Sequence, residues 1–234
     1  MLYSRFFKPE GGSPTTFDQL SSITRLSHKY NVGDLEEQAI SCLKTIFPDS
    51  YEDFHYFHET CVGNVLPVHA IGAVNLARLT GTHSILPSAL YLCCQLGSKI
   101  LDGWTREDGQ IENLSPEDLR LYVDGRMALT QQFIQLLLDI FQDSASEGCK
   151  SRRSCEEGMK NIFRVAMIAS KGSDPSALYS WSSTIRGLGR VYSICDLCQK
   201  HLRSRDNDAV KRVWAKLPEL MGVEVEGWCT PEDG

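Results

Sequence analysis

The chain has 234 residues, of which 42% are hydrophobic and 23% charged, and its formal net charge is −6. This acidic, ordinary globular composition argues against a nucleic-acid-binding protein, although a local basic patch is compatible with it. Apolar runs stay below the roughly 18 residues that span a bilayer, and the first residues lack the pattern of a secretory signal. We therefore expect an intracellular protein with no membrane partner.

The nine cysteines point to the same compartment. Their number is odd, their spacing is uneven, and Cys93 and Cys94 are adjacent. These properties favour buried thiols over a disulfide framework. We expect the reducing conditions of the cytoplasm or nucleus.

Apolar residues at helical spacing predict two short helices near the N-terminus, over 16–30 and 34–47. "NVG" separates them, and Pro48 ends the second. Two further apolar helices are predicted over 67–79 and 84–96. The polar stretch "GWTREDGQIENL" that follows is expected to be a loop or a small hairpin.

The strongest helical pattern covers 115–143. Ser115, Pro116 and Asp118 form its expected N-terminal cap and acidic first turn. A break follows within 143–158, and helical periodicity returns at 159–168, 178–202 and 208–221. With no series of strands and no fixed repeat, the sequence predicts an all-α fold.

Several blocks of the sequence resemble a known family. "LYSRFF" precedes a helical pair carrying the pattern L-x-x-KY-x-V-x-x-L, and "LPSALYLCCQL", "GWTREDGQIENLSPEDLRLYVDGRMAL" and "VWAKLPELMGVEVEGW" follow in order. The chain is similar to the C-terminal part of BTB/POZ domain-containing proteins of basidiomycete fungi. The matching positions in the helical pair are Leu26, Lys29, Tyr30, Val32 and Leu35.

The resemblance implies three regions: a partial BTB/POZ-like helical hairpin at 1–50, a helical region at 51–146 and a cysteine-containing helical region at 147–234. The N-terminal strands and first helices of a complete BTB domain are absent from the pattern, so we expect the polypeptide to begin in the middle of that fold. The apolar side of the hairpin is then expected to be only partly covered by later helices; it comprises Leu20, Ile23, Leu26, Leu35 and Leu43.

Two cysteine pairs suggest a metal site. "CKSRRSC" holds Cys149 and Cys155, and "CDLC" holds Cys195 and Cys198. Together they could provide four thiolates in a tetrahedral arrangement, which zinc favours. Four protein ligands leave no open position for catalysis, so such a zinc would be structural. The alternatives are a helix face that simply packs and a CxxC redox motif, which lacks its usual βαβ context here.

Other candidates for chemistry are weaker. His55 and His58 lie three residues apart beside acidic residues, which is more typical of a solvated helix face than of a metal or acid–base site. "RGLGRV" matches no phosphate-binding motif, and the sequence holds no nucleophile elbow. We assign no catalytic residue.

The sequence and the resemblance together predict a non-enzymatic protein–protein interaction protein of the BTB/POZ type, serving as an adaptor or regulator. Its expected partners are a second copy of itself or a cullin-type ubiquitin ligase, without nucleic acid or a small-molecule substrate. One alternative is a zinc-stabilised helical protein with a four-cysteine structural site, and another is a degenerate fragment without independent function.

Overall fold

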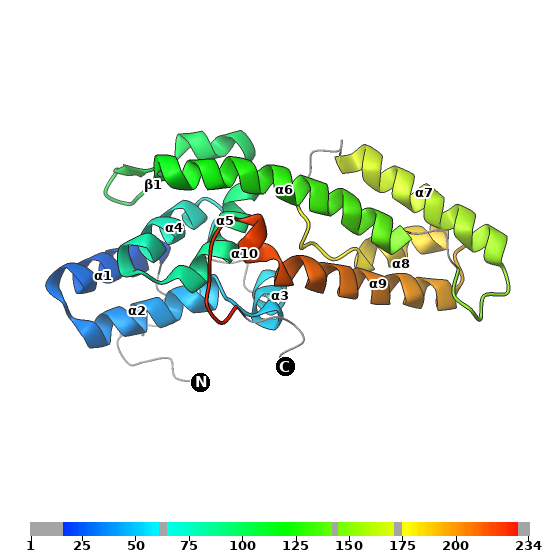
Figure 1. Ribbon diagram of the computed structural model, residues 1–234, viewed down its shortest axis with the longest axis horizontal. Helices are drawn as coiled ribbons and strands as arrows, with labels where there is room; N and C mark the ends of the chain where they lie inside the picture. The colour runs from blue at the N-terminus through cyan, green and yellow to red at the C-terminus, as the bar shows by residue number, and fades with distance from the viewer. Residues whose placement is uncertain (1–15, 61–64, 142–144, 171–174, 229–234) are drawn as a thin grey trace. The chain divides into compact units, whose positions relative to one another are not determined.

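The computed structural model describes residues 16–60, 65–141, 145–170 and 175–228, with the side chains of 57–60 left out (Figure 1). The described chain is mostly helical, which confirms the all-α prediction. None of the described helices combines the length and the apolarity needed to cross a membrane. The helices group into two compact units, residues 1–125 with 217–234 and residues 126–216. The three-region division at 50 and 146 stays a prediction.

The first unit opens with the predicted helical pair, α1 (Phe17–Tyr30) and α2 (Gly33–Ile46). The side chain of Thr16 accepts the backbone N–H of Gln19, whose own side chain accepts the N–H of Thr16, so α1 starts with a complete capping box. Asn31 adopts a left-handed conformation that ends α1 and lets the chain reverse into α2.

The first unit continues with α3 (Tyr51–Thr60), α4 (His69–Thr80), η1 (His83–Ile85), α5 (Leu86–Gln95) and η2 (Gly97–Asp102). The helices α4 and α5 pack on each other and are buried over most of their length. The short helix α10 (Leu217–Leu220) returns to contact α5. This helical layer forms the core of the first unit.

The polar connector after η2 forms the small hairpin that was one of its two expected forms. Its strands are β1 (Trp104–Thr105) and β2 (Ile111–Glu112), paired antiparallel with Trp104 opposite Glu112. The Glu112 carboxylate accepts two hydrogen bonds from Arg25 of α1, at 2.7 and 2.8 Å, and one from Asn75 of α4. The hairpin is therefore fixed to two helices of the core.

The α1–α2 hairpin is covered only in part, as expected. Leu20 and Leu43 are buried, while Ile23 and Leu35 are half-buried. Leu26, in the last turn but one of α1, is 54% exposed. The uncovered apolar surface therefore lies toward the turn of the hairpin.

The second unit consists of the later part of α6 (Pro116–Phe141), α7 (Arg152–Ser170), α8 (Ser182–Val191) and α9 (Asp196–Ala215). Each of these helices contributes one apolar face to a common core, as the periodicity of the sequence predicts. The buried residues include Leu129, Phe133, Leu137, Met159, Ile162, Ile185, Leu202 and Trp214.

The structure divides the helical region predicted over 178–202. The chain leaves the helical conformation after α8, and Ser193 has a φ of 54° in the left-handed region. The side chain of Ser193 is exposed, so the turn is held by its backbone and neighbours, with the N–H of Ile194 donating to Gly189 O at 2.8 Å. This break places Cys195 directly before α9.

Candidate metal centre

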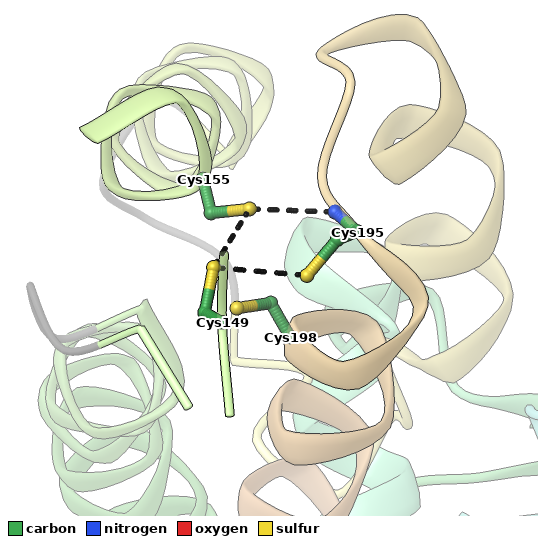
Figure 2. Close-up of side chains that lie close together, drawn as sticks. All are labelled: Cys149, Cys155, Cys195 and Cys198. Atoms are coloured by element: carbon green, nitrogen blue, oxygen red, sulfur yellow. Dashed lines mark hydrogen bonds between the residues drawn. The ribbon is translucent and has the colours of Figure 1, made fainter. Parts of the chain in front are cut away.

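The four cysteines predicted as metal ligands come together in the second unit (Figure 2). The Sγ atoms of Cys149, Cys155, Cys195 and Cys198 all lie within 4.8 Å of one another. Two separations are shorter: 3.6 Å from Cys149 to Cys155 and 3.8 Å from Cys149 to Cys195. Four sulfurs around zinc, with bonds of about 2.3 Å, stand about 3.8 Å apart, so the cluster is close to this geometry.

Three separate segments supply the ligands. Cys149 lies in the turn between α6 and α7, and Cys155 lies in the first turn of α7. Cys195 is the N-cap residue of α9 with an extended backbone, and Cys198 follows within the first turn of the same helix. The CxxC pair therefore wraps around a helix start, and the two cysteine pairs connect α7 to α9.

Backbone N–H groups point at the sulfurs. The N–H of Cys195 donates to Cys155 Sγ at 3.4 Å, and the N–H of Ser146 donates to Cys198 Sγ at 3.4 Å. The N–H of Cys198 donates to Cys195, and this hydrogen bond is the main cause that lowers the pKa of the Cys195 thiol. Such donors stabilise negative charge on sulfur, as bonds from the surroundings do at metal sites.

Burial acts in the opposite direction on the two inner cysteines. It raises the pKa of Cys155 to about 12 and also raises the pKa of Cys198. These thiols therefore keep their protons at neutral pH when no cation is near. A divalent cation at this position would supply the compensating charge, and its binding would release protons.

A close contact between α7 and the segment before Cys195 helps to position the cluster, and the sequence did not predict this contact. A Cβ atom on Gly158 of α7 would lie 2.7 Å from Ile194 Cγ1 and 2.9 Å from the backbone oxygen of Tyr192. Glycine therefore allows α7 to approach the segment just before Cys195. A glycine inside a strongly amphipathic helix was the only sequence signal of this contact.

The other candidates stay outside the cluster. His201, three residues after Cys198, is half-buried and is not one of the clustered ligands. The ring of His55 stacks on Tyr51 at 5.8 Å, and the side chain of His58 lies outside the described residues. Among the described residues, the four cysteines are the one group arranged to hold a metal ion.

Asp108 and Asp118 have structural partners. Asp118 is buried, accepts a hydrogen bond from Arg78 at 2.7 Å and belongs to the N-terminal cap of α6 together with Ser115. Asp108 accepts the backbone N–H of Gln110 within the hairpin turn. The Ser115–Asp118 contacts form the N-terminal cap expected for this helix, and Asp108 helps to close the turn of the β1–β2 hairpin.

Fold and site together define an all-α chain whose second unit carries a four-cysteine cluster of metal-ligand geometry. No family model, no curated protein and no solved structure matches the chain. The relationship to BTB/POZ proteins accordingly stays a prediction.

Proposed function

We propose that the second unit is a zinc-stabilised helical module and that its four cysteines together form a structural zinc site. The observation that carries this proposal is the convergence of four sulfurs from three segments within 4.8 Å. Zinc favours a tetrahedral set of thiolate ligands. Because all four positions are filled by protein ligands, the role is structural and not catalytic.

The proposed work of the metal is to fasten α7 to α9. Both helices meet the cluster through their first turns, and the turn after α6 supplies Cys149. Structural zinc contributes directly to folding free energy, since the unfolded chain offers no preformed site. None of the four cluster cysteines forms a disulfide. We place the protein in a reducing compartment, the cytoplasm or nucleus, where thiolates remain available.

Metal analysis tests the proposal. The full chain is purified under reducing conditions without added zinc, and metal content is measured together with native mass. We expect one zinc per chain, lost with part of the helicity when Cys195 and Cys198 are both replaced by Ser. The matched control is Cys42→Ser, a half-buried cysteine outside the cluster. Protein without zinc, with equal helicity in the double variant, would contradict the proposal.

A second candidate function is protein–protein contact through the turn of the α1–α2 hairpin. Leu26 is 54%, Tyr30 66% and Val32 46% exposed. Leu26 and Tyr30 are four residues apart in α1 and so share one face, beside Val32 in the turn. A group of exposed apolar side chains favours a contact surface. The BTB/POZ resemblance names the expected partners: a second copy of the chain or a cullin-type adaptor complex.

Native mass over a range of concentrations tests this second candidate. We expect self-association that is weakened by Leu26→Ser with Tyr30→Ser. Ile168→Ser is the control, because Ile168 is also exposed, at 77%, but lies on α7. A chain that stays monomeric at every concentration and retains no cullin in co-purification would argue against both partners.

A further inference from the structure

The four sulfurs of the cluster differ in exposure. Cys155 and Cys198 are fully buried, whereas Cys149 and Cys195 are half-buried. Figure 2 shows Cys149 on the turn that precedes α7 and Cys195 on the segment that enters α9, with a dashed line between their sulfurs. A solute that reaches the cluster therefore meets this pair first.

The sulfurs also differ in their hydrogen bonds. Backbone N–H groups donate to Cys155, Cys195 and Cys198. Within the part of the chain that the structure describes, no backbone N–H donates to Cys149 Sγ. Hydrogen bonds to a thiolate draw charge from it and make it a weaker nucleophile. Cys149 thus combines partial exposure with a sulfur that receives no backbone hydrogen bond from the described residues.

The turn that carries Cys149 lies outside the helices. It runs from Ala145 to Ser151, and Glu147, Gly148 and Lys150 are exposed. Cys155, by contrast, lies within the first turn of α7, and its sulfur is tied to the N–H of Cys195. The Cys149 and Cys195 sulfurs lie 3.8 Å apart, so a disulfide between them requires only a local shift of the turn.

We propose that Cys149 and Cys195 form an oxidation site at which a peroxide converts two zinc ligands into a disulfide and releases the metal. The proposal rests on the zinc site proposed above. Cys149 thiolate attacks one oxygen of hydrogen peroxide, the O–O bond breaks, and the departing hydroxide takes a proton to become water. Cys149 becomes a sulfenic acid.

Cys195 thiolate then attacks the Cys149 sulfur. The S–S bond forms, the S–O bond breaks, and the second hydroxide leaves as water after taking a proton. Two thiolates have given two electrons to one peroxide. Cys155 and Cys198 alone cannot complete a tetrahedral site, so zinc leaves and the metal-dependent link between α7 and α9 is lost.

The test uses the zinc-loaded full chain, freed of reductant, titrated with hydrogen peroxide in the presence of a chromogenic zinc chelator. We expect one zinc released per peroxide consumed and recovery of binding after reduction with added zinc. Disulfides are mapped after digestion with trypsin and a protease that cuts before aspartate. Cleavage before Asp196 separates Cys195 from Cys198, and cleavage at Lys150, Arg152 and Arg153 separates Cys149 from Cys155.

The Cys149–Cys195 disulfide as the first product would support the proposal, and Cys42→Ser should leave zinc release unchanged. A first disulfide between any other pair would overturn it. Zinc that stays bound in a tenfold excess of peroxide while Cys42 oxidises would also overturn it and leave the structural site intact. If the purified protein holds no zinc before any peroxide is added, the proposed zinc site itself is wrong, and the oxidation proposal fails with it.

Discussion

At the scale of single residues, the site depends on contacts that side-chain chemistry alone does not reveal. The sequence predicted all four ligands, because Cys195 and Cys198 have the CxxC spacing of metal ligands and Cys149 and Cys155 form a second pair with a longer spacing. The hydrogen bond from the N–H of Ser146 was not predicted, because a backbone donor leaves no pattern in the sequence. The close approach at Gly158 was not predicted either, because a glycine within a helical pattern does not show which segment packs against it.

Gly158→Ala should therefore disturb the four-cysteine cluster, although Gly158 is not one of its ligands. The new methyl group would push against Ile194 and the Tyr192 carbonyl and displace the segment that carries Cys195. We expect a loss of about 1–3 kcal/mol in the free energy of unfolding, as for other overpacked contacts, and a weaker affinity for zinc. Denaturant unfolding and zinc competition with a chelator measure the two effects.

Gly187→Ala is the matched control, because it lies inside α8 and a Cβ there has nothing within 4 Å. It should raise stability by about 0.5–1 kcal/mol through helix propensity and leave zinc affinity unchanged. Equal behaviour of the two alanine variants would refute the packing argument.

A buried histidine gives the first unit a pH dependence. His69 stacks on Phe17 at 4.7 Å, and its Nδ1 accepts the N–H of Leu66. Burial lowers the pKa of His69, with a smaller opposing effect of Asp18. As pH falls below about 6.5, the unfolded chain takes up a proton at this residue before the folded chain does. The stability of the first unit should therefore decrease from that pH toward the lower folded-state pKa.

Denaturant unfolding at several pH values between about 8 and about 5 measures this slope, since the range brackets the ordinary histidine pKa. His69→Phe keeps an aromatic ring beside Phe17 but cannot titrate. The variant should be less stable at the alkaline end, because the N–H of Leu66 loses its acceptor, and its stability should depend less on pH. Identical slopes in the two proteins would show that His69 is not responsible.

At the scale of elements, the apolar pattern predicted the positions of α1, α2, α4, α5 and α6. The helices α1, α2 and α6 bury one face each, while α4 and α5 are apolar and buried over most of their length. The apolar pattern did not predict the break between α8 and α9. Apolar residues continue at helical spacing through this region, and the break depends on one backbone, that of Ser193, in a left-handed conformation. A single unusual backbone conformation of this kind is invisible to a hydrophobic pattern.

Substitution at Ser193 tests what the break does. Valine is strongly disfavoured in the left-handed region, and Ser193→Val should cost about 1–2 kcal/mol and weaken zinc binding by moving Cys195. Asparagine tolerates this conformation, so Ser193→Asn should keep both properties. The side chain is exposed, so packing does not complicate the comparison. Circular dichroism melts and chelator competition give the readout, and a valine variant that matches the asparagine variant would argue against the idea.

At the scale of the whole molecule, the two units differ in charge. Residues 126–216 hold 15 Lys and Arg against 9 Asp and Glu, a formal charge of +6, while the rest of the chain holds 9 against 21, a formal charge of −12. The acidic average therefore conceals a basic unit. The net charge of the whole chain argues against nucleic-acid binding, but the net charge of the second unit does not.

Metal removal should act on one unit. With a zinc chelator, hydrogen exchange is expected to rise in α7, α8 and the first turns of α9, whose link depends on the cluster. The helices α4 and α5 hold no cluster ligand and should keep their protection. Mass spectrometry of exchanged peptides measures both, and a uniform rise over both units would contradict a local role for the metal.

The first unit is formed by two segments of the chain that lie on either side of the second unit, so it cannot be complete until the second unit has been synthesised. Leu217 and Met221 are fully buried in the first unit. The Met221 side chain packs against Gly125 so closely that a Cβ there would clash with it. The first unit therefore needs residues that are translated after the whole second unit. On the ribosome, the face of α5 that meets α10 must wait for about ninety intervening residues to be synthesised. A nascent chain that stalls before Leu217 would expose that unfinished core to chaperones.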